Sequence, residues 1–207
     1  MKEAKDGIIQ KGGNRTKALW RGILIQIWRK PFFKEIEMES SEPEPITDVP
    51  DFNASQWIIA WLALGNRFPI KGKTVFVKQL FVTGKELVPR IDQLFGFFPH
   101  RFGPYSFVFD SALKEVVEKG FVEVTPHQES ADDAPIRPPR LDYRLSPAGE
   151  IEASRLFGKI PEESWIALEQ YRKMLSRMGF WGLLTYVYSN YPQYTMFSEI
   201  DPLNKEG

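Results

Sequence analysis

HRFGPYSFVFDSALKEVVEKGFVEV, residues 100–124, decides the fold of this chain. Gly103 and Pro104 mark a turn, and Ser106 is a residue type that caps the start of a helix. Apolar residues then recur at helical spacing, which gives the helix an inward face: Phe109, Ala112, Leu113, Val116 and Val117. Gly120 is a typical helix stop, and residues 121–124 have the pattern of a short strand.

Two helices are expected before this stretch. Asn53 or Ser55 can cap the first, which runs through the apolar residues 57–64 toward Gly65. The passage KTVFVKQLF (73–81) predicts a second helix over residues 73–83, followed by a stop at Gly84. Its apolar positions face inward, and its polar positions are expected on the exposed side: Lys73, Lys78 and Gln79. Another short helix is expected after Pro89.

The passage LDYRLSPAGE (141–150) completes the pattern on the other side. Residues 141–145 predict a strand, and Ser146 followed by Pro147 predicts the cap and first position of a helix that continues to Phe157. The loop between the two strands is then a candidate wing. This order of elements predicts a mainly α fold with a small antiparallel β-wing, an α+β winged helix-turn-helix with additional N- and C-terminal helices.

Charge and composition divide the chain into three parts. Residues 1–34 carry nine Lys or Arg against two acids, whereas residues 35–53 carry seven acids and no base. We therefore expect a basic then acidic arm with a linker at 1–52, a winged-helix domain at 53–158 and a helical extension at 159–207. Apolar residues at helical spacing around Trp20 and Trp28 make the arm a candidate amphipathic element, although the same residues also permit a strand.

The overall composition narrows the function classes. The formal net charge is zero, so DNA contact would need a local basic patch. Without cysteine there is no disulfide or thiolate site, and the two histidines lack the spacing of a metal motif. The sequence contains none of the common phosphate-loop, serine-nucleophile or zinc-protease motifs, so we expect no enzyme activity, no catalytic residue, no metal and no cofactor. No apolar stretch reaches the length of a membrane span, and a cytoplasmic protein without membrane contact is expected.

Three passages resemble the Panacea or SocA-like antitoxin domains and the related YwgA-like proteins of bacteria and archaea. KTVFVKQLF resembles the lysine-containing early helix of that family, and HRFGPYS resembles its Tyr-Gly-Pro turn, with Phe102 in place of the usual tyrosine. VYSNYPQYTMFSEI (187–200) is similar to C-terminal passages of these proteins. The resemblance covers roughly residues 55–157 and implies a non-enzymatic regulatory or antitoxin-like role.

Two functions follow as hypotheses. The first is a transcriptional regulator-like protein that binds duplex DNA, with five contact residues: Lys73, Lys78, Arg101, Arg137 and Arg140. These are candidates for a larger basic surface with Lys71, Lys85, Arg90 and His100. The second is an antitoxin-like module for protein–protein interaction, which the net charge of −1 on the expected helix 105–119 favours, because carboxylates oppose phosphate binding.

The C-terminal extension is expected to contain a helix from about Pro161, with Glu162 and Glu163 in its first turn. Residues 180–191 after Gly179 are aromatic or apolar on nearly every face, which predicts a buried helix. A homodimer formed through this segment is one hypothesis. Packing of the helix on the chain's own core is the simpler interpretation.

Overall fold

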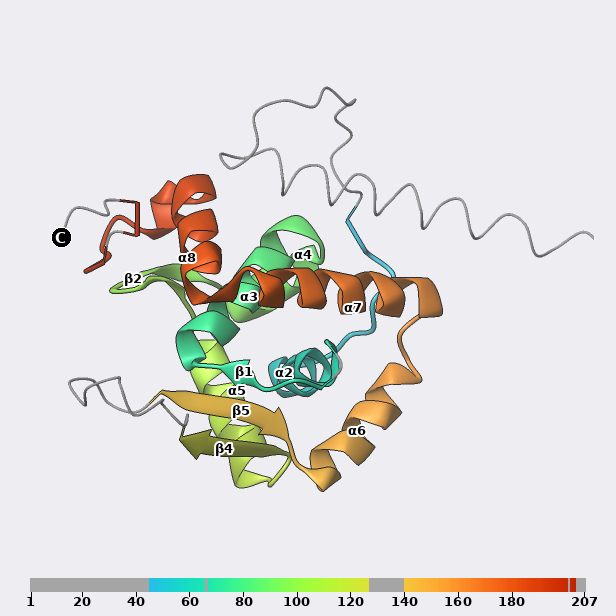
Figure 1. Ribbon diagram of the computed structural model, residues 1–207. Coiled ribbons are helices and arrows are strands. Elements are labelled where there is room, and N and C mark those ends of the chain that lie inside the picture. Colours follow the sequence, from blue (N-terminus) through green and yellow to red (C-terminus); the bar gives the residue numbers. More distant parts are fainter. Residues whose placement is uncertain (1–44, 66, 127–139, 201, 204–207) are drawn as a thin grey trace, which may run out of the picture. The chain divides into compact units, whose positions relative to one another are not determined.

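The computed structural model describes residues 45–65, 67–126, 140–200 and 202–203, and the chain divides into two compact units, Met1–Ile46 and Thr47–Gly207. The second unit holds all the elements described here, labelled as in Figure 1. Its elements up to the predicted wing are α2 (Ala54–Ala63), β1 (Ile70–Lys71), α3 (Lys73–Glu86), α4 (Pro89–Phe95), β2 (Phe98–His100), β3 (Gly103–Tyr105), α5 (Phe107–Glu118) and β4 (Val122–Pro126). The later ones are β5 (Leu141–Leu145), α6 (Pro147–Phe157), α7 (Glu162–Arg177), α8 (Gly179–Asn190) and the 3-10 turn η1 (Pro192–Tyr194).

The unit is mainly helical with a small antiparallel sheet, as the α+β prediction states. The three strands of this sheet have the order β1-β5-β4, so β5 lies in the middle. Register is set by Tyr143, which pairs with Ile70 on one side and with Val124 on the other. The buried ring of Tyr143 points to the core and contacts Phe76 of α3 at 5.9 Å between ring centroids. A separate two-stranded hairpin is formed by β2 and β3.

Helix α2 lies at the centre of the core, as its nearly all-round apolarity predicts. Asn53 caps it by a reciprocal capping box with Gln56, and Trp57 and Trp61 are fully buried. The helix packs against α5 on one side and α6 on another, which leaves no solvent face for its large side chains (Figure 1). Full burial of one such side chain contributes about 1.5–3 kcal/mol or more, so α2 is a main source of stability.

The expected stop of α3 at Gly84 is wrong, because the helix continues through this glycine to Glu86. A Cβ atom at Gly84 would lie 2.7 Å from the backbone nitrogen of Asp92 in α4. Glycine is therefore required for the close approach of α3 and α4. The chain turns only after Glu86, where the N–H groups of Leu87 and Val88 both donate to the carbonyl of Thr83.

The C-terminal helices close over α3. Helix α8 packs on α3 and α7 contacts both (Figure 1). The Glu86 carboxylate at the end of α3 accepts three hydroxyl hydrogen bonds, at 2.9 Å from Tyr171, 2.5 Å from Tyr186 and 2.6 Å from Tyr191. The prediction that residues 180–191 form a helix is confirmed, but only one side is buried, and Trp181 is exposed.

Local start signals predicted the helices well. Ser106 and Ser146 cap α5 and α6 through hydrogen bonds from Phe109 N and Gly149 N, as expected. The strand expected at 121–124 begins one residue later and extends to Pro126. Strand β1 and the β2–β3 hairpin were not predicted. Among the described residues, none of the helices is both long and apolar enough to span a bilayer. The arm up to residue 44 and the candidate wing at 127–139 lie outside the described residues.

Candidate functional site

A cluster of polar side chains lies where α3, β3 and α5 begin or end, and we call it the Lys73 cluster. Lys73 Nζ lies 2.6 Å from Asp110 Oδ1 and donates to the Tyr105 hydroxyl at 3.2 Å. The Tyr105 hydroxyl in turn donates to Asp110 Oδ2. His100 completes the cluster, because its ring stacks on the Tyr105 ring with centroids 4.8 Å apart. All four side chains are partly exposed, so the cluster lies at the surface.

Local structure places these groups. Gly72 starts α3 with a φ of 94°, a conformation that favours glycine, and puts Lys73 at the first helical position. In the hairpin, Tyr105 pairs with Phe98, which lines up the rings of β2 and β3 on one face. Asp110 is in the first turn of α5, where a carboxylate is favoured by the helix dipole.

The cluster keeps both its proton donors protonated near neutral pH. Partial burial by itself lowers the pKa of Lys73, but the hydrogen bonds and charges of Asp110 and Tyr105 outweigh it and raise this pKa above its usual value. Burial, followed by the Asp110 carboxylate, raises the pKa of Tyr105, against the opposing effect of Lys73. The cluster connects α3, β3 and α5 to one another. Because the lysine charge is balanced by Asp110, little net charge is left for a ligand.

Beside the Lys73 cluster lies an aromatic edge with exposed members. The Phe98 and Phe107 rings are 5.0 Å apart, and Phe107 also meets Tyr105 edge-on at 5.8 Å. Phe107 is 66% exposed and its neighbour Val108 is 43% exposed. We use the name aromatic edge for Phe98, Tyr105, Phe107 and Val108. Neighbouring exposed apolar side chains of this kind make the edge a candidate contact site.

The rest of the solvent face of α5 carries both signs of charge. Lys114 pairs with Glu118 at 3.7 Å, and Lys119 pairs with Glu115 at 2.5 Å. With Asp110, residues 107–119 contain three acids and two bases, a net charge of −1. The face is therefore not attractive to phosphate groups.

Two of the predicted contact residues do lie together. Arg140 packs against Gly72, since a Cβ atom there would be 3.1 Å from Arg140 Cδ, and Lys73 is the next residue. Lys71, which precedes Gly72, is exposed. Lys71, Lys73 and Arg140 thus surround the start of α3, next to the ends of β4 and β5. Arg137 lies outside the described residues.

Other basic residues of the expected surface are held elsewhere by acids. Arg101 Nε lies 2.6 Å from Glu199 Oε1, and Lys85 Nζ lies 2.7 Å from Asp92 Oδ2. Arg90 pairs with Asp51. These pairs offset the positive charge and separate it over different elements, so the described residues do not form the continuous basic surface that the sequence suggested.

The expected exposure of Lys78 and Gln79 is wrong. Lys78 is 2% exposed and its amine donates to the Phe102 carbonyl, while Gln79 accepts a hydrogen bond from Trp61 Nε1 at 3.2 Å. The helical periodicity of the sequence predicted these two side chains on the exposed side of α3. The hairpin and the C-terminal helices that cover α3 come later in the chain, so the local pattern does not reveal them. Lys78 is therefore not accessible to a phosphate group.

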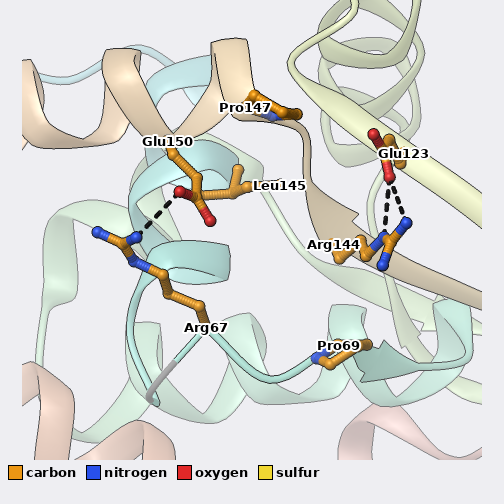
Figure 2. Close-up of a pocket in the computed structure, with 7 residues that line it drawn as sticks. All are labelled: Arg67, Pro69, Glu123, Arg144, Leu145, Pro147 and Glu150. Carbon is orange, nitrogen blue, oxygen red and sulfur yellow. Dashed lines mark hydrogen bonds and ion pairs between the residues drawn. The ribbon is translucent and has the colours of Figure 1, made fainter.

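A surface hollow of about 410 Å³ lies between the sheet and α6. Figure 2 shows its two arginines, Arg67 and Arg144, each turned toward its own glutamate. Arg67 Nη1 lies 3.0 Å from Glu150 Oε2, and Arg144 Nη2 lies 2.7 Å from Glu123 Oε2. The charges of the hollow are thus paired within it, and its remaining wall is formed by Pro69, Leu145 and Pro147.

Sequence reasoning missed two groups that the fold brings together. The aromatic edge was missed because no strand was predicted within FGFFPHRFGPY (95–105), although Gly103-Pro104 was recognised as a turn signal that a hairpin could use. The tyrosines around Glu86 were missed because they lie 85, 100 and 105 residues away along the chain. In the part of the chain that the structure describes, no group of three or more acids and histidines is arranged to hold a metal ion.

No protein-family model matches the chain, and no curated protein matches its sequence. The resemblance to the Panacea or SocA-like antitoxin domains and the YwgA-like proteins therefore stays a prediction.

Proposed function

We propose that residues 54–157 form a winged helix and that the protein is a non-enzymatic regulatory protein that binds a partner protein through the aromatic edge. The fold proposal is supported by the order α2-β1-α3-α5-β4-β5, with α4 and the hairpin inserted before α5, and by the strand order β1-β5-β4. In such a fold α5 occupies the position of the recognition helix. The contact face of α5 then decides the class of partner.

The observation that carries the proposal is the exposure of Phe107 and Val108 at the start of α5, followed by a solvent face that carries paired charges of both signs. The complementary partner has an apolar recess for these two side chains and a polar rim opposite the charged pairs of α5. Burial of an exposed phenylalanine contributes up to about 1.5–3 kcal/mol, which is the size of a typical interface anchor.

The first test compares matched surface substitutions in the full chain. Phe107→Asp and Val108→Asp introduce a carboxylate in the first turn of α5, where it does not oppose the helix. Ile151→Asp is the control, because Ile151 is 75% exposed and belongs to a different helix, α6. In chemical cross-linking with quantitative mass spectrometry, we expect one specific partner to be lost by both α5 variants and retained by the control.

Light scattering on the same proteins shows whether the partner is a second copy of this chain, since wild type would then have twice the mass of the Phe107→Asp protein. A partner retained by all three variants contradicts the proposal, because binding would then use another surface.

Duplex DNA is the second candidate, and the position of Lys71 and Arg140 beside the start of α3 is the observation that favours it. Phosphate groups are attracted both to basic side chains and to helix N-termini. We expect Lys71→Glu with Arg140→Glu to weaken any DNA binding of the full chain and to reduce its salt slope by roughly one to two. Fluorescence anisotropy over a salt series measures this. Strong DNA binding that these substitutions abolish and Phe107→Asp leaves intact would favour DNA over a protein partner.

A further inference from the structure

Lys78 has an unusual position for a lysine in the middle of a helix. It is 2% exposed and lies on the side of α3 that faces the β2–β3 hairpin and α8. Its amine donates a hydrogen bond to the carbonyl of Phe102, which is at the tip of the hairpin. Lysine side chains are almost never fully buried without a partner, so this position has to be maintained by the surrounding structure.

The hairpin tip fits closely over this amine. Gly103 has a φ of 83°, and a Cβ atom there would lie 3.2 Å from Tyr188 Cε2 and 3.5 Å from Lys78 Cε. On its other side the tip is tied to the segment after η1, where Glu199 N donates to the Arg101 carbonyl at 2.8 Å. The tip is thus held from the core by Lys78 and from the surface by Glu199.

Charge is scarce around the Lys78 amine. On the hairpin the nearby titratable and charged groups are His100 and Arg101, α8 contributes Tyr188, and the segment after η1 contributes Glu199, which pairs with Arg101. Among the described residues, no carboxylate pairs with Lys78. Burial consequently lowers the pKa of Lys78 to about 7.

We propose that Lys78 is a positioning residue that latches the tip of the β2–β3 hairpin in a proton-dependent manner. Because β3 also carries Tyr105, the latch sets the position of the aromatic edge. In this respect the inference rests on the proposed function, since the edge is the surface that the partner meets. The local effect on the hairpin does not depend on a partner.

The direction of the pH effect follows from burial. Burial disfavours the protonated amine of Lys78 when the hairpin is closed. The closed state therefore binds fewer protons than the open state, in which the amine is hydrated. The closed hairpin is therefore favoured at high pH and is weakened as the pH falls from the usual lysine range toward 7. Between these limits, opening that hydrates Lys78 becomes more frequent by at most about tenfold per pH unit.

The direct test is an NMR titration of the lysine ¹³Cε resonances of the full chain, with the Lys78 signal assigned by its absence in Lys78→Met. We expect a midpoint near 7 for Lys78 in the wild type, well below the usual lysine value of about 10.5. A midpoint in the ordinary lysine range near 10.5 overturns the proposal, because the amine would then be charged in the closed state throughout the physiological range.

The consequence for the hairpin is measured by hydrogen exchange of peptides covering residues 98–105, between pH 7 and 9, after correction for intrinsic exchange rates. We expect protection to rise with pH in the wild type and in the control Lys114→Met, whose lysine is exposed. In Lys78→Met protection is lower, since the Phe102 carbonyl loses its donor, and it no longer depends on pH.

His100→Gln tests whether His100, a titratable residue of the hairpin, causes the pH dependence instead of Lys78. If this variant abolishes the pH dependence, or if Lys78→Met retains it, the latch is not Lys78 and the proposal fails. These readouts use the protein alone. A negative result in the partner-binding experiment therefore leaves the latch intact, and a hairpin without pH dependence leaves the partner proposal intact.

Discussion

Helix α3 has a tyrosine–carboxylate cluster at each end, and the two clusters differ in how far they are closed to solvent. At its start, Tyr105 and Asp110 meet Lys73 at the surface. At its end is the more enclosed cluster, in which the partly buried Glu86 carboxylate accepts from Tyr171 of α7, Tyr186 of α8 and Tyr191, the residue after α8, and Tyr171 is fully buried. The same chemistry thus serves two purposes. The enclosed cluster fastens helices together, whereas the open one braces an edge that remains exposed.

Removing the acceptor of the enclosed cluster is expected to have the largest effect. Glu86→Ala leaves three hydroxyls without their carboxylate, and we expect it to lower the free energy of unfolding by about 3–5 kcal/mol. Urea unfolding followed by circular dichroism measures the change. Glu118→Ala, which removes an exposed carboxylate of α5, is the control and should change stability by less than about 0.5 kcal/mol. Equal effects of the two substitutions would mean that the tyrosines are satisfied by water.

Single hydroxyl deletions compare the two clusters directly. Tyr186→Phe removes one donor to Glu86 and should cost about 1–2 kcal/mol, because the bond is charge-assisted and partly buried. Tyr105→Phe should cost less than about 1 kcal/mol, since solvent can replace the lost contact with Asp110. The same unfolding assay applies. A larger loss of unfolding free energy for Tyr105→Phe than for Tyr186→Phe would mean that the cluster at the start of α3, and not the one at its end, contributes more to stability.

The dependence of stability on alkaline pH should distinguish the Lys73 cluster from the Glu86 cluster. The pKa of Lys73 is raised in the folded protein, so its contribution is present below the usual lysine value of about 10.5 and is lost as the pH rises through the folded value. Asp110→Asn removes the main cause of this shift. We expect the variant to be less stable than wild type at pH 8 by about 0.5–1 kcal/mol and to lose less stability between pH 10 and 11. Parallel pH profiles would show that the pair contributes nothing.

The smallest effect on stability is expected at the aromatic edge. Phe107→Ala should change the free energy of unfolding by less than about 0.5–1 kcal/mol, because the ring is mostly exposed and only its contacts with Phe98 and Tyr105 are lost. Phe76→Ala, on the same assay, should cost about 3–5 kcal/mol, since Phe76 is fully buried. If Phe107→Ala is as damaging as Phe76→Ala, the edge is a part of the core and not a contact surface.

Short-range signals explain why much of the fold was predictable. Ser106, Ser146 and Pro147 act within one helical turn, and each begins the helix that its sequence context indicates. Gly84 was misinterpreted because a glycine stops a helix and also permits close helix packing, and only the position of Asp92 in α4 distinguishes the two. The predicted exposure of Lys78 was wrong for a related reason, because this side chain is covered by a hairpin that was not predicted.

The candidate site was less predictable than the fold. Lys73 was named for its charge, but its importance in the structure comes from Tyr105 and Asp110, which lie 32 and 37 residues further along the chain. Arg140 reaches the same place only through the pairing of β1 with β5. Such convergence depends on topology, and the local pattern of residues contains no information about it.

The distance along the chain between Glu86 and its tyrosines has a consequence for biosynthesis. Helix α3 is translated long before α7 and α8, so the nascent chain presents the apolar face of α3, including Phe81, without its cover. The three tyrosine hydrogen bonds to Glu86 are complete only after Tyr191 has been synthesised. Transiently exposed apolar surface of this kind is prone to aggregation, so pausing of the ribosome between α6 and α7 would prolong the period in which aggregation competes with folding.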